Sequence, residues 1–141
     1  MAKSANLQRT RYVFQYAVKF ICTANIPGTS QTSDAVLPGV YQTAVNIHNP
    51  QTIKARIRKK IASPLGISKY FESILEADGV QRVVCSQINE FGITFIHGFE
   101  GFLVIESTHS LDVAAVYTAG ARGEQVASID IEYVKERKLG S

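Results

Sequence analysis

The 141-residue chain has no tryptophan, one methionine and two cysteines, and only 19% of its residues are charged. No stretch approaches the roughly 18 consecutive apolar residues of a membrane-spanning helix. The first residues also lack the uninterrupted apolar segment of a signal peptide. We therefore expect a soluble protein, either cytoplasmic or exported by a route that the sequence does not show. Its length fits one domain, which can bury a sufficient core without a metal or a disulfide.

Signatures of catalysis and of cofactor binding are also missing. There is no GxSxG nucleophile elbow, and the glycines of GFEG and AGARG lack the strand–loop–helix context of a phosphate-binding loop. The histidines His48, His97 and His109 form no HxH or HxxxH pair. His97, with Glu100 nearby, is the best single metal candidate, but its position favours an ordinary turn histidine. We predict a protein that is not an enzyme and has no catalytic residue, cofactor or metal. A hydrolase or metal enzyme is the weakest alternative.

The two cysteines, Cys22 and Cys85, each lie within an apolar run, which favours two buried core thiols. Neither is flanked by the basic groups or the helix N-terminus that would make a thiol reactive. A disulfide between them requires that their strands face one another, and the sequence leaves this open.

Short runs rich in Val, Ile, Tyr, Phe and Thr, separated by turn residues, dominate the chain. They predict an all-β fold, a single-domain antiparallel β-sandwich of immunoglobulin-like or jelly-roll type with about 8–9 strands over residues 11–135. The polar residues 1–10 are expected to form a flexible arm and residues 136–141 a loose tail. Residues 67–77 fit a helix, or a strand before a hairpin turn at Asp78 and Gly79. The β-rich surroundings favour the strand.

Several motifs resemble those of a known family. The run GFEGFLVIES, followed by LDVAAVYTAG and SIDIEYV, with VYQTAVNIHNP earlier, resembles a family of small bacterial β-sandwich proteins of unassigned function. The likeness covers about half of the chain and lies in strand and turn patterns. It implies the fold and gives no residue a role.

The segment NPQTIKARIRKKIA, residues 49–62, alternates apolar and basic residues. Its inward parity carries Ile53, Ala55, Ile57 and Ile61. Its outward parity carries Lys54, Arg56, Arg58 and Lys60, which would form a ridge about 20 Å long on one strand. Lys59 falls on the inward parity. We expect the alternation to fail there, either through a bulge or because the end of the strand has left the core.

Three interpretations of this basic row remain open. It can be a solvated face or an edge strand, where basic side chains deter strand addition. It can pair with acidic residues such as Asp130 and Glu132, on a neighbouring strand or another subunit. It can bind a polyanion, either an acidic polysaccharide, a nucleic acid or an anionic surface. Asp130 and Glu132 themselves alternate with an apolar row, Val126, Ile129, Ile131 and Tyr133.

The net charge of +3, from 15 basic and 12 acidic residues, is small for a dedicated nucleic-acid binder. No specific nucleic-acid motif accompanies it. We predict a non-catalytic structural or protein-interaction module that forms homo-oligomers through strand edges and the arm at residues 1–10. The alternative is a polyanion-binding module that uses Lys54, Arg56, Arg58 and Lys60.

Overall fold

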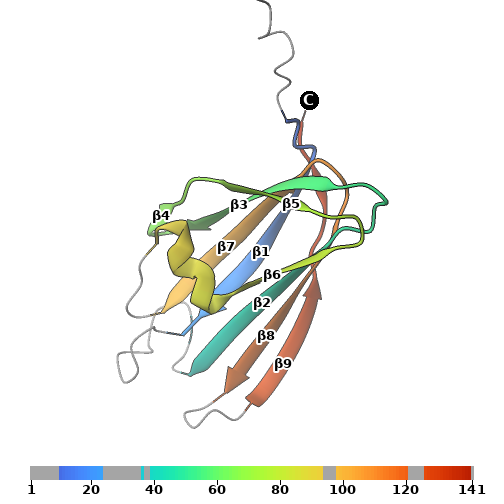
Figure 1. The fold of residues 1–141 in the computed structure, drawn as a ribbon. Coiled ribbons are helices and arrows are strands. Elements are labelled where there is room, and N and C mark those ends of the chain that lie inside the picture. The colour runs from blue at the N-terminus through green and yellow to red at the C-terminus, as the bar shows by residue number, and fades with distance from the viewer. Residues whose placement is uncertain (1–9, 24–35, 37–38, 94–97, 121–125, 141) are drawn as a thin grey trace, which may run out of the picture.

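The computed structural model describes residues 10–23, 36, 39–93, 98–120 and 126–140. In these ranges the chain forms ten strands and one short helix, arranged as two antiparallel sheets around a shared core (Figure 1). The predicted all-β sandwich is confirmed, with slightly more strands than the sequence indicated. Within the same ranges, no helix is long and apolar enough to cross a membrane.

The larger sheet has six strands in the order β10-β1-β7-β3-β4, with β5 also paired to β3. Its strands are β1 (Phe14–Cys22), β3 (Ala55–Ser63), β4 (Gly66–Ile67), β5 (Phe71–Leu75), β7 (Phe99–Ser107) and β10 (Arg137–Lys138). The smaller sheet has the order β6-β2-β8-β9. Its strands are β2 (Val40–His48), β6 (Val80–Val84), β8 (Asp112–Gly120) and β9 (Val126–Tyr133), and a 3₁₀ helix, η2 (Cys85–Phe91), follows β6.

Most connections between strands cross from one sheet to the other. β4 and β5 place strands at residues 66–67 and 71–75, so the region 67–77 forms strand rather than helix, as the sequence favoured. The predicted hairpin at Asp78 and Gly79 is wrong. β5 pairs with β3 in one sheet, whereas β6 pairs with β2 in the other. Asp78 has the positive φ of 58° that this tight crossing requires. The segment at Asn49 to Gln51 is also a crossing, from β2 to β3, and not a hairpin loop.

Buried side chains alternate with more exposed ones along β1, β2, β3 and the start of β8, as the sequence predicted for residues 49–62. The buried, inward-facing side chains of these strands include Tyr16, Val18, Phe20, Thr43, Val45, Ile47, Ala55, Ile57, Ile61, Val113 and Ala115. Ile53 differs, with 55% of its surface exposed. β3 begins only at Ala55, so Ile53 lies in the bend before the strand and has no inward face to occupy.

A disulfide joins Cys22 to Cys85, with 5.8 Å between their Cα atoms. The interpretation of two free core thiols is therefore wrong. Cys22 ends β1 in the larger sheet, and Cys85 directly follows β6 of the smaller sheet. The bond therefore ties the two sheets together at one end of the sandwich.

The C-terminal segment differs from the loose tail that the sequence indicated. Arg137 and Lys138 form β10, which pairs with the start of β1. The Leu139 amide donates to the Val13 carbonyl at 2.7 Å, extending this pairing by one hydrogen bond. At the other terminus, residues 1–9 of the expected arm lie outside the described residues.

Candidate functional site

The basic row does not lie on an edge strand. β3 pairs with β7 on one side and with β4 and β5 on the other, so the edge interpretation is wrong. Lys54 precedes the strand, and its ammonium lies 4.0 Å from the Glu76 carboxylate. The row on the strand is therefore Arg56, Arg58 and Lys60, on the outer face of the larger sheet.

Arg58 is the centre of a satisfied polar cluster on this face. Its guanidinium carbon lies 4.3 Å from the Tyr12 ring centre and 4.1 Å from that of Tyr70. Its Nε and Nη2 donate to the Glu106 Oε1 at 2.8 and 2.6 Å. The other carboxylate oxygen, Oε2, accepts from Gln15 Nε2 at 2.8 Å and from the Tyr70 hydroxyl at 3.1 Å. Arg58 is therefore committed to internal contacts.

Glu106 is a buried carboxylate, with 5% of its side chain exposed. Burial pushes its pKa upward, but the hydrogen bonds from Arg58, Gln15 and Tyr70 outweigh burial and leave the pKa below its ordinary value. For Arg58, the interpretation that the basic row pairs with an acidic residue is therefore correct, but the partner is Glu106. The suggested partners Asp130 and Glu132 lie on β9, in the other sheet, and make no such pair with any residue that the structure describes.

β9 is the most exposed long strand, and every one of its residues is exposed. Among the described residues it pairs only with β8, and it forms one edge of the smaller sheet, as Figure 1 shows. The exposed fractions of its apolar side chains are 66% at Val126, 63% at Ile129, 56% at Ile131 and 85% at Tyr133. The apolar row that the sequence revealed therefore faces solvent.

This row continues across the outer surface of the smaller sheet. Ile131 lies opposite Val116 on β8, Val116 opposite Ala44 on β2, and Ala44 opposite Val84 on β6. Opposed residues point to the same side of a sheet, and the neighbours Val45 and Ala115 are buried in the core. We call this surface the outer apolar face, which comprises Ala44, Val84, Ala114, Val116, Ile129, Ile131 and Tyr133.

The acidic residues of β9 lie on its opposite side, toward the interior of the sandwich. Asp130 lies opposite Tyr117 and Glu132 opposite Ala115. The Tyr117 hydroxyl donates to the Lys19 carbonyl at 2.8 Å and approaches Glu132 Oε1 at 3.1 Å. Burial, followed by the hydrogen bond with Glu132, raises the pKa of Tyr117 above its ordinary range. β9 thus presents an apolar side outward and an acidic side inward.

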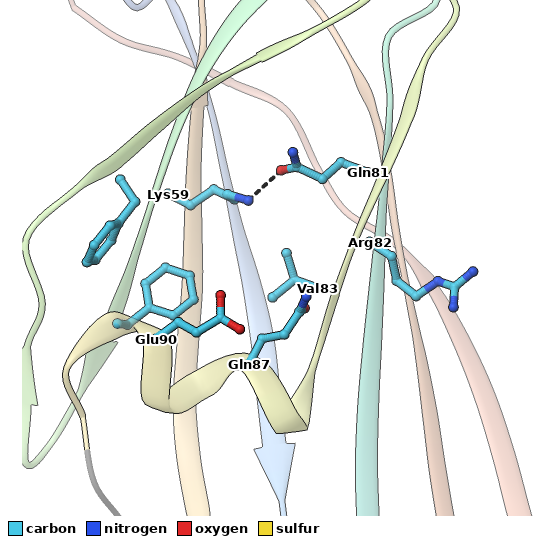
Figure 2. A pocket seen from close by; sticks show the side chains of 8 residues that line it. Lys59, Gln81, Arg82, Val83, Gln87 and Glu90 are labelled. Carbon is cyan, nitrogen blue, oxygen red and sulfur yellow. Dashed lines mark hydrogen bonds between the residues drawn. The ribbon is translucent and has the colours of Figure 1, made fainter.

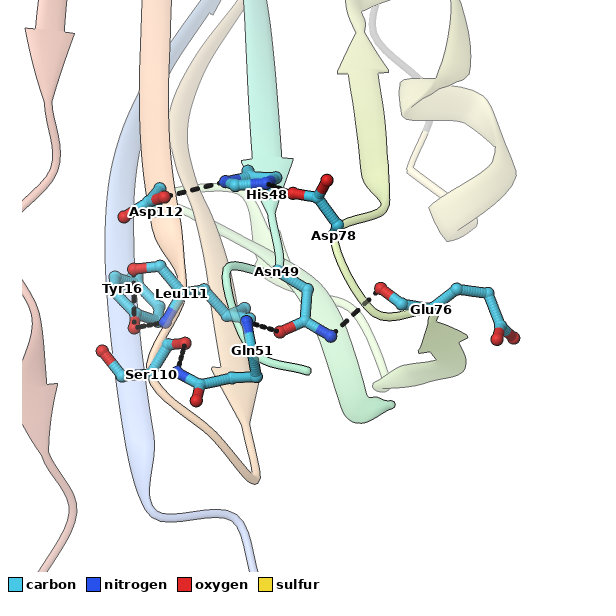
Figure 3. Close-up of polar contacts among 9 residues, drawn as sticks. All are labelled: Tyr16, His48, Asn49, Gln51, Glu76, Asp78, Ser110, Leu111 and Asp112. Carbon is cyan, nitrogen blue, oxygen red and sulfur yellow. Dashed lines mark hydrogen bonds and ion pairs between the residues drawn. The ribbon is translucent and has the colours of Figure 1, made fainter. Parts of the chain in front are cut away.

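His48 ends β2 and links three segments of the chain (Figure 3). Its Nε2 lies 2.7 Å from Asp78 on the crossing between β5 and β6, and its Nδ1 lies 2.8 Å from Asp112 at the start of β8. A carboxylate accepts but does not donate, so both ring nitrogens carry protons when both contacts form. The hydrogen bonds with Asp78 and then Asp112 therefore raise the pKa of His48.

We expect an NMR titration to place the imidazole pKa of His48 above its ordinary value of 6.5. Because the folded-state pKa is raised, the contribution of His48 to folding is complete at low pH and is lost as the pH rises through that pKa. Asp78→Asn and Asp112→Asn should each lower the pKa, whereas Glu76→Gln, at an exposed carboxylate nearby, serves as the control. An unchanged pKa in both aspartate variants would refute this account.

Asn49 is a buried side chain whose role the sequence did not reveal. Its Nδ2 donates to the carbonyls of Ile53, Leu75 and Glu76 at 2.9, 3.1 and 3.1 Å. Its Oδ1 accepts from the Gln51 amide at 3.0 Å (Figure 3). The two hydrogens of this amide thus serve three carbonyls where the chain crosses between the sheets. An Asn-Pro dipeptide signals a turn in sequence, but not these partners, because Leu75 and Glu76 are distant along the chain.

Comparison with known proteins supplies only the fold. No family model and no curated protein matches the sequence. Among solved structures, the fold is similar to the "Crystal Structure of Thermotoga maritima 1070", with a TM-score of 0.58 and 9% sequence identity over 89% of this chain and 95% of that chain. This likeness supports the sandwich architecture. Like the resemblance to small bacterial β-sandwich proteins, it gives no residue a role.

Proposed function

We propose that this domain is a non-catalytic interaction module that self-associates through the outer apolar face of its smaller sheet. The observation that carries the proposal is the exposure of Ile129, Ile131 and Tyr133 in one row on β9. Single exposed apolar residues are ordinary on protein surfaces, but a contiguous patch across several strands is a feature of interaction sites.

A second copy of the chain is the partner that suits this surface. None of its seven side chains is charged, and Arg82, on the same side of the edge strand β6, lies at its margin. A two-fold axis near β8 and β9 therefore brings apolar side chains of two copies together. The centre of the face carries the small residues Ala44 and Ala114, and the larger Ile131 and Tyr133 rise beside them. This combination of small and large side chains allows the side chains of one sheet to interdigitate with those of another.

Edge-to-edge pairing of two β9 strands is less favourable than this face-to-face contact. An antiparallel pair centred on Ile131 places Asp130 opposite Glu132 twice, and directly opposed like charges destabilise a sheet. A shift of one residue instead places apolar side chains of one copy opposite acidic side chains of the other. The acidic residues of β9 therefore disfavour the addition of a strand from another chain at this edge.

The polyanion alternative has weaker support. Arg58 is neutralised by Glu106 and enclosed by two tyrosine rings, so the centre of the basic row is occupied by internal contacts. Lys60 lies over the Tyr70 ring, with its ammonium 4.7 Å from the ring centre. Arg56 and Lys54 remain exposed at one end of the row. This arrangement supports a structural role for Arg58 more than a ridge of free cations.

We expect the double variant Ile129→Lys/Ile131→Lys to remain monomeric at concentrations where the unmodified protein associates, as measured by sedimentation velocity. Two faces that meet would each bring two ammonium groups together, with a cost in association free energy of several kcal/mol. Both positions are exposed in the monomer, so the stability of the variant should change by less than about 1 kcal/mol.

Two controls locate the contact. Leu65→Lys/Ile67→Lys removes apolar side chains that are 84% and 69% exposed in the larger sheet and its turn, and it should leave the association unchanged. A variant that lacks residues 1–9 should also associate if the face, rather than the arm, provides the contact. Equal association of both lysine double variants would contradict the proposal.

A further inference from the structure

A cavity of about 230 Å³ opens between the two sheets, away from the outer apolar face. β3 and β5 form one wall, β6 forms the other, and η2 closes one end (Figure 2). Figure 2 shows Lys59 and Glu90 directed into the same space from different elements, whereas Arg82 points away from it. The cavity thus combines one cationic and one anionic group.

Lys59 is the exception that the sequence pattern identified, and its backbone is regular. The pairing continues through it, opposite Phe71 on β5 and Ile105 on β7, so the suggested bulge is wrong. Its ammonium therefore lies on the core side of the sheet, where it donates to Gln81 Oε1. Burial lowers the pKa of Lys59, and the negative charge of Glu90 opposes this shift.

The charge of Lys59 is incompletely satisfied. Among the described residues, no carboxylate lies within the 4.0 Å of an ion pair from its ammonium. An ammonium has three donors, of which Gln81 uses one. Glu90, an exposed residue on η2, faces the cavity without an ion pair to Lys59. The cavity therefore offers separated charges of both signs to a ligand.

The rest of the lining combines the amides of Gln81 and Gln87 with apolar side chains. Phe71 and Phe91 contact each other edge to face, with 5.3 Å between ring centres and 87° between ring planes. Val83 is 2% exposed and lines the same space. A dry cavity of about 150 Å³ is large enough to hold benzene, so this larger cavity can accept one ring or a branched alkyl group together with a small polar head.

We propose that this cavity binds a free amino acid with an apolar side chain. Its carboxylate pairs with Lys59, its ammonium pairs with Glu90, and its side chain packs against Phe71, Phe91 and Val83. A ligand with both charges satisfies both protein groups at once. A simple anion would leave Glu90 unpaired and repelled, and a simple cation would do the same to Lys59. This inference is independent of the proposed self-association.

The test uses L-phenylalanine and L-leucine as probes, with benzoate and phenethylamine as singly charged controls. NMR shift changes of Val83, Phe91 and Gln87 amides on the full chain report binding. The amino acids should bind with millimolar or tighter affinity, and each singly charged probe should bind more weakly by about tenfold or more. Lys59→Met and Glu90→Gln should each reduce amino-acid affinity by a similar factor.

Lys60→Met is the matched control, because Lys60 lies on the opposite face of the same strand, over the Tyr70 ring. It should leave the affinity unchanged. A thermal melt of each variant identifies any loss of folding, and only folded variants are compared. Absence of amino-acid shifts at millimolar concentration would overturn the proposal, as would equal binding of benzoate and L-phenylalanine.

Discussion

Replacing both Cys22 and Cys85 with alanine should lower the free energy of unfolding by about 4 kcal/mol. The two cysteines are 63 positions apart, so the bond closes a long loop in the unfolded chain. The loop-closure model predicts that a disulfide stabilises a protein by about 3 kcal/mol when it closes a loop of 15 residues, and by about 4.7 kcal/mol when the loop has 100 residues. The melting temperature should fall by roughly 10 °C or more for a domain of this size. Guanidinium unfolding monitored by far-ultraviolet circular dichroism provides the measurement.

Reduction of the unmodified protein is the matched comparison. If the covalent link is responsible, the reduced protein and the double alanine variant should have similar stability, apart from the lost packing of the two sulfur atoms. Hydrogen bonds at the same end of the sandwich, such as Thr43 Oγ1 to the Ile21 carbonyl at 2.8 Å, should keep the sheets together in the folded form. A loss below about 1 kcal/mol would show that the bond does not restrain the unfolded chain.

The substitution Arg58→Met should destabilise the domain by about 3 kcal/mol. It leaves the Glu106 carboxylate buried with only Gln15 and Tyr70 as donors, and a buried charge without its partner is costly. Methionine keeps an apolar stem but lacks the guanidinium that lies over the Tyr12 and Tyr70 rings, so the loss combines the ion pair with these two cation–π contacts. Denaturant unfolding at neutral pH measures it.

Arg56→Met is the control on the same face of β3, because Arg56 is exposed and should cost less than about 0.5 kcal/mol. The double variant Arg58→Met/Glu106→Leu should recover much of the loss, because an apolar pair has no charge to desolvate. Equal losses in Arg56→Met and Arg58→Met would contradict a special role for Arg58.

The same pair predicts a pH dependence. The pKa of Glu106 is lower in the folded protein, so its stabilising effect is complete above its ordinary value of 4.5 and is lost as the pH falls through the folded pKa. Arg58→Met should flatten this acidic limb of the stability curve.

The sequence predicted what depends on alternation and missed what depends on which strands become neighbours. The buried parity of β1, β2, β3 and β8 follows from local patterns, because a one-residue slip would expose the whole apolar row. The Asp78–Gly79 turn has the residues of a hairpin, but Leu75 and Val83 both enter the core from opposite sheets. Their burial favours a crossing, which local turn chemistry does not reveal. The disulfide could not be predicted for the same reason, because the sequence does not show that the end of β1 lies beside the end of β6.

The candidate site shows the same division. The basic row and the inward position of Lys59 were visible in sequence, but the partner of Arg58 was not, because Glu106 becomes its neighbour only through the pairing of β3 with β7. The alternation in β9 was also visible. Its outward direction could not be inferred, because an apolar row resembles a core row until the edge position of the strand is known.

A dilution series followed through the methyl signals of Ile129 and Ile131 tests the central claim most directly. If the outer apolar face is the contact between copies, these two signals should shift or broaden with rising concentration, while those of Leu65 and Ile67 remain constant. Signals of all four residues that are unchanged up to millimolar protein, or changes confined to Leu65 and Ile67, would contradict self-association through this face.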